Sequence, residues 1–318
     1  MENDIMVSIC CLAYNQEKYI RQTLDGFLMQ KCEFKFEIII HDDASTDHTA
    51  EIIREYEEKY PDIIKPIYQS ENQYSKGKRV LLEFVYPSIN GKYFALCEGD
   101  DFWSDCNKLN LQYKCLENHS DCKMCLHKVE GISENGESNK LLYPNFSLKE
   151  GILSRKELID YICTNDYVFQ TSCYFGESKC INELLSNTPQ FYLSSSTGDT
   201  PLLLYFATKG NFYYIDRIMS SYRHDSSSSV ERRNTYNDTE DKIVKWFNKQ
   251  ITMLEEFDNY TNGSYHYYCK RKIKGYDFDR ALRNNDYKEV IKPKYWYFTR
   301  KYSFKGKLIL LLKAFGIK

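Results

Sequence analysis

The chain has 318 residues, 42% of them hydrophobic and 28% charged, and a formal net charge of −2 at pH 7. That length is sufficient for one large α/β domain with an appendage, and the near-neutral charge gives no reason to expect a nucleic-acid partner. No segment approaches the roughly 20 apolar residues of a membrane-spanning helix, so we do not expect an integral membrane protein.

The N-terminus and the cysteine content bear on the compartment. The acidic start, Met1–Asp4, leads directly into an apolar run and lacks the pattern of a secretory signal. We therefore expect a cytoplasmic protein whose twelve cysteines are small buried thiols. The alternative is a zinc site in a C-x6-C-x2-C-x-H cluster, although this spacing lacks paired C-x2-C knuckles. The members of that cluster are Cys115, Cys122, Cys125 and His127.

The first hundred residues alternate between strand and helix patterns. Val7–Leu12 is a nearly continuous apolar run, which is typical of a buried parallel strand, whereas Glu17–Met29 carries apolar residues at helical spacing. Further strands are predicted at 36–40, 63–68 and 93–97, and further helices at 45–56 and 78–86. This alternation predicts an α/β fold with a doubly wound, mostly parallel sheet flanked by helices.

The rest of the chain is less regular until its last third. Residues 131–150 are typical of a polar loop, and Ser154–Glu157 fits a capping box that opens a helix. Beyond them we predict a helix at 202–208 that Gly210 ends, strands at 212–215 and 219–222, and helices at 242–257 and 265–284. We place a boundary near residue 230, between an α/β domain at 1–230 and a helical extension at 231–318.

Polar residues follow the predicted strands at their carboxyl ends, where doubly wound sheets bind ligands. Tyr14 follows the first strand, the pair Asp42 and Asp43 the second, and Glu98–Asp101 the fourth. We expect Asp43 to accept hydrogen bonds from a base or a ribose. The alternative is that one member of the pair caps the next helix, which would explain one carboxylate but not both.

The carboxylates after the fourth strand indicate a metal ion. Glu98, Asp100 and Asp101 would repel one another unless a cation compensated their charge. We expect Mg²⁺ or Mn²⁺ here, because these ions bind oxygen ligands while bridging to substrate phosphates. The alternative is a solvated acidic turn, which the apolar pair Phe102-Trp103 disfavours. A further carboxylate, Asp199, is either the N-cap of the helix that follows it or a general base.

Three segments resemble successive motifs of the family 2 glycosyltransferases, which have the GT-A fold. They are Val7–Asn15, His41–Thr49 and Glu98–Trp103, and their order and spacing match as well. The likeness runs from about residue 5 to residue 224. It implies an inverting enzyme, a hexosyl or N-acetylhexosaminyl transferase, that uses a nucleoside-diphosphate sugar, commonly a UDP-sugar.

The resemblance assigns expected roles to single residues. Asp43 would hold the uracil or ribose, with Leu12 and Tyr14 beside the nucleotide. Asp100 would contact ribose or sugar, and Asp101 would be the direct metal ligand. Asp199 lies in a segment similar to the one that bears the catalytic base. Tyr222-Arg223-His224 resembles the closing strand of the family, where His224 would approach the metal or the diphosphate.

Two departures narrow this interpretation. The chain lacks the Q-x-x-R-W motif and the transmembrane helices of the processive polysaccharide synthases, which favours addition of one or a few sugars. The acceptor, a glycan or a lipid-linked molecule, is not readable from the residues. The expected setting is surface-polysaccharide or glycolipid assembly in the cytoplasm, at the inner face of the cell membrane.

Two other function classes remain as alternatives. A sugar nucleotidyltransferase would have a glycine-rich loop after its first strand, but this chain has Leu12-Ala13-Tyr14-Asn15 there. A non-catalytic protein of the same fold that binds sugar nucleotides or glycans would lack the base, whereas Asp199 is present.

The tail, residues 288–318, is rich in lysine and arginine interleaved with aromatic and aliphatic residues, and Glu289 is its one acidic residue. Such a segment suits contact with an anionic membrane surface. The alternative is a helix that packs on the rest of the protein with its lysines in water.

Overall fold

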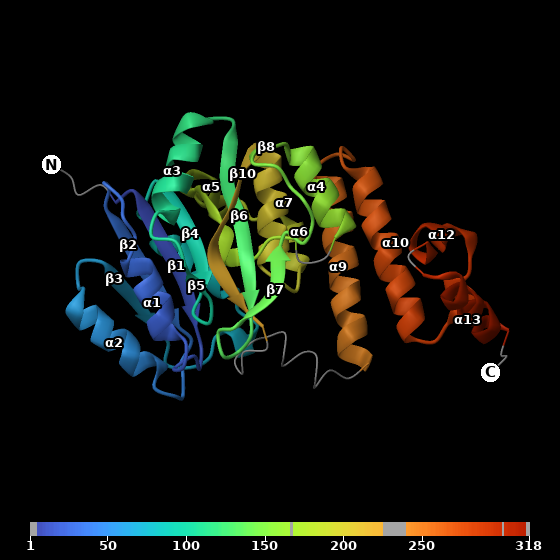
Figure 1. The fold of residues 1–318 in the computed structure, drawn as a ribbon, viewed down its shortest axis with the longest axis horizontal. Coiled ribbons are helices and arrows are strands. Elements are labelled where there is room, and N and C mark those ends of the chain that lie inside the picture. The colour runs from blue at the N-terminus through green and yellow to red at the C-terminus, as the bar shows by residue number, and fades with distance from the viewer. Residues whose placement is uncertain (1–4, 166–167, 225–239, 301, 316–318) are drawn as a thin grey trace.

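The computed structural model describes residues 5–165, 168–224, 240–300 and 302–315. A large sheet with helices on both faces forms the body of the molecule, and two long helices lie beside it (Figure 1). The boundary predicted near residue 230 lies outside the described residues.

Ten strands of the described chain form one mixed sheet in the order β3-β2-β1-β4-β9-β6-β10-β5, with β7 on β6 and β8 on β10. The first four strands of this order are parallel, β6 and β10 are parallel, and β5, β7, β8 and β9 pair antiparallel. The strands are β1 (Val7–Ala13), β2 (Phe36–Asp42), β3 (Ile64–Tyr68), β4 (Tyr93–Glu98), β5 (Phe102–Trp103), β6 (Cys122–Ile132), β7 (Ser138–Tyr143), β8 (Gly151–Leu153), β9 (Phe175–Glu177) and β10 (Asn211–Arg223).

Helices cover both faces of this sheet. Neighbouring residues of a strand point to opposite faces, and in the central strands both sets of side chains are apolar and become buried under helices. Cys10 belongs to one hydrophobic cluster, whereas Ile9 and Cys11 belong to another. The cluster of Ile9 includes side chains of α1 (Ile20–Leu28), α2 (Thr49–Lys59) and α3 (Lys108–Asn118). The cluster of Cys10 includes side chains of α4 (Arg155–Thr164), α5 (Ser178–Ser186), α6 (Gln190–Ser194), α7 (Asp199–Lys209), α9 (Glu240–Tyr260) and α10 (His266–Arg283).

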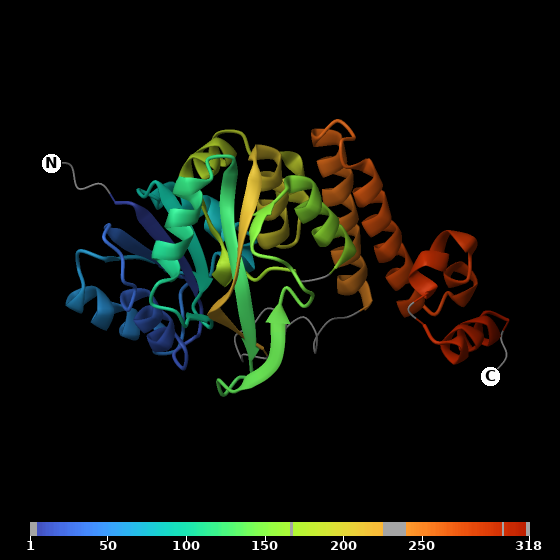
Figure 2. The same ribbon diagram turned by 45° about the horizontal axis from the view of Figure 1, so that its top comes forward.

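The helical C-terminal part has a small core of its own. Phe278 and Ala281 of α10 pack with Val290 of α11 (Tyr287–Val290), with Tyr295, and with Leu310 of α13 (Phe304–Ala314). Between them lies the one-turn helix α12 (Trp296–Thr299). Both views place α12 and α13 at the end of the molecule away from the sheet (Figure 2). The tail therefore packs on the end of α10. No helix in the described part of the chain is long and apolar enough to cross a bilayer.

The predicted strands and helices of the first hundred residues are confirmed except one, although the helix predicted at 45–56 begins at Thr49. The helix predicted at 78–86 is a π-helical turn, Leu81–Val85, followed by a 3-10 turn, Tyr86–Ser88. Pro87 in that last turn has no N–H to continue a helical ladder. The capping box is also confirmed, because the Ser154 amide donates to Glu157 Oε2 at 3.0 Å and the Glu157 amide donates to Ser154 Oγ at 3.2 Å.

Two predictions farther along the chain are wrong. The polar segment 131–150 contains β7, an edge strand that is largely exposed and so lacks an apolar alternation. The two strands predicted at 212–215 and 219–222 are one strand, β10, whose pairing with β6 shifts register between Ile215 and Ser220. This irregularity places polar residues in mid-strand, which the sequence pattern alone presents as a break.

Candidate active site

The loops that follow β1 and β2 are bonded to each other through side chains. Asn15 and Ala44, one in each loop, have positive φ angles of 54° and 59°. The Asn15 amide donates to Ser45 Oγ at 3.0 Å, and Asn15 Oδ1 accepts from the Thr46 amide at 2.8 Å. A left-handed backbone conformation at a non-glycine residue raises the free energy of the folded state unless surrounding contacts stabilise it. The hydrogen bonds between the two loops stabilise both turns.

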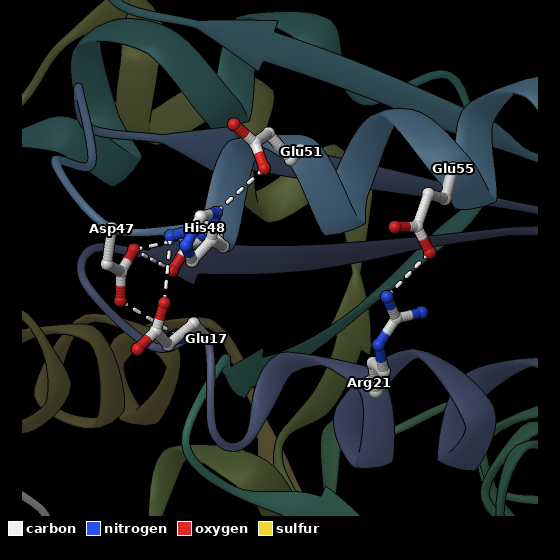
Figure 3. A network of polar contacts seen from close by, with 7 residues as sticks. Glu17, Arg21, Asp47, His48, Glu51 and Glu55 are labelled. Atoms are coloured by element: carbon white, nitrogen blue, oxygen red, sulfur yellow. Dashed lines mark hydrogen bonds and ion pairs between the residues drawn. The ribbon is translucent and has the colours of Figure 1, made fainter.

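A second group of bonds joins the starts of α1 and α2, as Figure 3 shows. Asp47 Oδ1 accepts from the Thr49 amide at 3.0 Å, while its Oδ2 accepts from the Glu17 amide at 3.1 Å. The Glu17 carboxylate in turn accepts from the His48 amide at 3.0 Å. The hydroxyl and carboxylate groups of 45–49 thus mainly fix two loops together, and α2 begins only at Thr49.

Asp42 and Asp43 have different partners, which answers the question the sequence left open. Asp42 accepts from the hydroxyl of Ser45 at 2.5 Å and so closes its own turn. Asp43 is 4% exposed, and its two oxygens accept from the amides of Gln73 and Tyr74 at 2.8 and 3.0 Å. Neither carboxylate bonds to an amide of α2, so the helix-cap alternative is wrong for Asp43, which instead anchors the loop after β3.

The loop that joins β4 to β5 is held at close range by its surroundings. A Cβ at Gly99 would lie 2.9 Å from Ile20 Cδ1, 3.1 Å from the Leu12 carbonyl and closer still to Gln16, so a side chain here would force these neighbours to shift. The buried hydroxyl of Thr23 on α1 lies 2.9 and 2.6 Å from the carbonyl oxygens of Gly99 and Asp101. Gly99 and Asp101 are therefore built into the body of the protein, whereas Glu98 is exposed, so the alternative of a solvated acidic turn is wrong for Asp101.

Asp101 and Arg223 link this loop to the end of β10. Asp101 is 2% exposed, and its Oδ1 accepts from the Arg223 amide at 2.9 Å. The Arg223 guanidinium, also buried, donates to the Asp100 carbonyl at 3.0 Å, to Gln22 Oε1 at 2.9 Å and to the Glu134 carbonyl at 2.8 Å. Arg223 thereby ties the β4–β5 loop to α1 and to the β6–β7 turn.

Burial, and then neighbouring negative charge, raises the pKa values of Glu98 and Asp101. Protein groups packed around the Glu98 carboxyl, then the charges of Asp100 and Asp199, raise its pKa to about 8; because the residue also has exposed surface, water reduces this effect. Burial and then the charge of Asp100 raise the pKa of Asp101 above its ordinary value, although the Arg223 amide opposes this. The site thus concentrates negative charge, which a cation would relieve.

Asp199 is the first residue of α7, and Gly198 is the N-cap. Asp199 does not cap this helix with its side chain, and its Oδ1 is buried without a hydrogen-bond partner. Because its charge raises the pKa of Glu98, this carboxylate lies within electrostatic reach of the residues after β4. The N-cap alternative for Asp199 is therefore wrong, and an unpartnered carboxylate oxygen remains near the charged loop.

The other expected site residues are arranged as follows. Leu12 is partly buried, and its carbonyl accepts from the Gly99 amide at 2.9 Å, while Tyr14 is partly exposed in the loop after β1. His224 Nε2 lies 2.9 Å from the Tyr143 hydroxyl, with the two rings stacked at 5.9 Å. In this arrangement His224 is bonded to β7 and not to Asp101.

Across the described ranges, no three histidine, cysteine, aspartate or glutamate side chains are grouped to hold a metal ion. This applies to the cysteine cluster that the sequence presented as a zinc alternative; all twelve cysteines are free thiols. It does not argue against Mg²⁺ or Mn²⁺ at Asp101, since Mg²⁺ commonly binds through one or two carboxylates together with substrate phosphates and water.

Residues 8–176 match the family model described as glycosyl transferase family 2. The match covers slightly more than half of the 318 residues. The chain belongs to this family.

Curated relatives of this family 2 chain are similar over parts of their length. An uncharacterized protein of Mycobacterium tuberculosis is 40% identical over 169 residues, which are 52% of this chain and 46% of that protein. An uncharacterized glycosyltransferase of Methanocaldococcus jannaschii is 29% identical over 147 residues, 46% of this chain and 49% of that protein. The chain spans about half the length of the curated relatives it matches.

Solved glycosyltransferases share the fold of this family 2 chain. The structure of Staphylococcus aureus TarS residues 1–349 with UDP-GlcNAc has a TM-score of 0.61 at 16% identity, covering 98% of this chain and 80% of that one. The mannosyltransferase PcManGT of Pyrobaculum calidifontis, solved with GDP-Man and Mn²⁺, has a TM-score of 0.52 at 13% identity, covering 98% and 86%. The predicted GT-A fold is confirmed.

No role was predicted from the sequence for two arginines that position segments of the site, Arg223 and Arg79. Arg223 lies in the closing motif, where an arginine within an apolar strand pattern was a signal of a buried cation. Arg79 donates to the carbonyl of Ser195 at 2.6 Å and to that of Leu193, four and six residues before Asp199. No sequence signal pointed to Arg79, because its partners are backbone atoms of a distant loop.

Proposed function

We propose that this chain transfers a sugar from a nucleoside-diphosphate sugar, UDP-linked, to a hydroxyl of a glycan or lipid-linked acceptor, with inversion at the anomeric carbon. Membership of glycosyl transferase family 2 supports sugar transfer. The donors in the solved neighbours, UDP-GlcNAc in TarS and GDP-Man in PcManGT, support a nucleotide-sugar donor.

In this proposal the donor lies across the carboxyl ends of β1, β2 and β4. Asp43 accepts hydrogen bonds from the uracil or ribose, with Leu12 and Tyr14 beside the nucleotide, and Asp100 contacts the ribose or sugar. Support comes from the backbone amides that already orient the Asp43 carboxylate and from the lacing of the loops around it.

Asp101 would hold the divalent ion, Mn²⁺ or Mg²⁺, with His224 as a further candidate ligand. The fit rests on the donor chemistry: a buried carboxylate beside Glu98 and Asp100, with a raised pKa that a cation would reverse. When bound, the ion supplies positive charge to the departing diphosphate. The Arg223 amide fixes the orientation of Asp101, and the hydroxyl of Thr23 fixes its backbone.

Asp199 is the proposed general base, and its unpartnered Oδ1 is the observation that carries the proposal. This oxygen is shielded from solvent, and it keeps its capacity to accept a proton because no protein donor uses it; the acceptor hydroxyl would have to reach it. As the proton moves to Asp199, the acceptor oxygen bonds to the anomeric carbon from the face opposite the diphosphate, whose bond to that carbon breaks. The nucleoside diphosphate leaves with the electron pair of that bond.

The test compares Asp199→Asn with wild type in release of UDP from UDP-sugars and in donor binding. Loss of the base should lower turnover by about 10²- to 10⁴-fold and leave donor affinity nearly unchanged. Glu98→Gln tests the neighbouring carboxylate. The matched control is Asp62→Asn, which changes an exposed carboxylate just before β3, at the amino ends of the parallel strands and not at their carboxyl ends. Wild-type turnover in Asp199→Asn, with loss in Glu98→Gln, would move the base to Glu98.

The remaining rival is a non-catalytic sugar-nucleotide or glycan-binding protein of the same fold. It predicts donor binding without release of UDP from any donor and acceptor. To reach a lipid-linked acceptor, the protein would have to bind at a membrane surface. We propose that the basic tail, residues 288–318, makes the contact with that membrane.

A further inference from the structure

The outermost helix of the described chain, α13, presents large apolar side chains to solvent. Phe304 is 85% exposed, Leu308 46%, Leu311 44% and Phe315, which directly follows the helix, 73%. Soluble proteins rarely expose a contiguous set of this kind without a partner for it. An adjoining face of α13 is used for packing, since Leu310 and Ala314, about 90° to 130° around the helix from these residues, are buried.

These four residues form one stripe along the helix. Positions 304, 308, 311 and 315 follow the spacing of four, three and four residues, so at 3.6 residues per turn they fall within an arc of about 60°. We call Phe304, Leu308, Leu311 and Phe315 the apolar stripe. It lies to one side of the face through which Leu310 packs against α10 and α11, and Ile309, 43% exposed, lies outside it.

Lysines border the apolar stripe on both sides. At about 100° per residue, Lys307 lies on one edge and Lys305 on the other, and both are exposed. Helix α13 contains no acidic residue. The acidic residue of the tail, Glu289, is already paired with Lys292 and Lys294. The surface around the stripe is therefore cationic.

We propose that the apolar stripe of α13 inserts into the interface of an anionic lipid membrane, with Lys305 and Lys307 at the level of the headgroups. An apolar helix face bordered by lysines matches a surface that is apolar inside and negatively charged outside, and lysine stems extend along apolar surface while their ammonium groups stay in water. The proposal deepens the membrane contact proposed for 288–318, and it holds independently of Asp199 and the metal.

The packing of the tail explains why point substitutions test this better than truncation. Deleting 288–318 would remove Val290, Tyr295 and Leu310 and expose Phe278 and Ala281 of α10. Loss of membrane binding would then be inseparable from loss of folding. Substitutions in the apolar stripe change side chains that the fold leaves in solvent.

The experiment measures flotation of the full chain with vesicles of phosphatidylcholine alone and of phosphatidylcholine with 30% phosphatidylglycerol. The wild type should bind the anionic vesicles and release at 0.5 M salt in part, because salt screens the lysines but not the apolar burial. Phe304→Ser/Phe315→Ser should lower partitioning by at least about tenfold. Lys305→Gln/Lys307→Gln should lower it by about fivefold for each lysine at low salt only.

The matched control is Tyr267→Ser/Ile152→Ser, which replaces side chains that are 69% and 51% exposed elsewhere on the protein and should leave flotation unchanged. Equal flotation of all variants, or none by the wild type, would overturn the proposal. So would a wild-type oligomer that Phe304→Ser/Phe315→Ser converts to monomer, because the stripe would then bind a second copy. UDP binding measured on the same samples reports on the proposed function separately.

Discussion

Replacing Arg223 by methionine should destabilise the protein strongly, although the substitution keeps most of the side-chain volume. The guanidinium makes four side-chain hydrogen bonds, to the carbonyls of Asp100, Ser133 and Glu134 and to Gln22. It also lies 4.6 Å from the ring centre of Tyr19. Methionine removes all of these contacts and keeps only the backbone amide that donates to Asp101.

The size of the effect follows from what becomes of the abandoned carbonyls. A buried acceptor left without a donor costs about 1–3 kcal/mol, but a hollow of about 440 Å³ adjoins Arg223, so water can reach some of them. Taking about 1 kcal/mol for each of the four bonds lowers the free energy of unfolding by about 4 kcal/mol. For a chain of 318 residues that corresponds to a fall in Tm of about 6 °C.

Calorimetry should compare Arg223→Met with Arg217→Met, a matched change on the same strand. Arg217 forms an ion pair with Asp105 at 2.6 Å while 53% exposed, and surface pairs contribute about 0–1 kcal/mol. Arg223→Met should also weaken UDP binding in the presence of Mn²⁺, since the Asp100 carbonyl loses its anchor. If the Tm of Arg223→Met lay within 2 °C of the Arg217→Met value, the stabilising role assigned to the Arg223 hydrogen bonds would be refuted.

Three further predictions concern the same loop and its support. EDTA should weaken UDP binding by at least about tenfold in titration calorimetry if Asp101 reaches the diphosphate through a metal ion; equal affinities would contradict that bridge. Gly99→Ala should cost about 1–2 kcal/mol in urea unfolding, because its Cβ would press on the Leu12 carbonyl at 3.1 Å and displace the end of the Gln16 side chain. Burial lowers the pKa of Lys108 to about 8, whereas the pKa of a lysine in the unfolded chain is about 10.4. Between these two pH values the unfolded state binds more protons than the folded state, so the free energy of unfolding rises with pH. Lys108→Met should remove a slope of up to about 1.4 kcal/mol per pH unit; an unchanged profile between pH 8 and 10 would contradict this.

The sheet and the ends of its strands could be predicted because their signals are local. β1, β2 and β4 are apolar runs that stop at polar residues, so both the strands and the position of Asp43 and Asp101 were readable. Helix α3 and strand β6 were not, because their buried polar residues interrupt both periodicities. Lys108 and Gln112 of α3, for example, are fully buried and bond to each other at 2.7 Å.

The rest of the site depends on contacts between distant segments, which no local pattern records. Arg223 can bond to the β4–β5 loop only because β10 lies beside β5, where Ser220 pairs with Trp103. His224 turns toward Tyr143 only because β7 pairs with β6. Asp199 could have been an ordinary helix cap, and its lack of a partner is visible only in three dimensions.

The late position of β10 in the chain has a consequence for biosynthesis. Asp101 receives its amide hydrogen bond from Arg223, 122 positions later, and β10 fills the sheet between β6 and β5. While the nascent chain emerges from the ribosome, β6 has an open edge and the acidic loop lacks its anchor until residue 223 has been made. Contacts between such distant segments close slowly, and open strand edges favour wrong pairing. During the interval between translation of β6 and of β10, this edge of β6 is therefore open to pairing with a wrong strand.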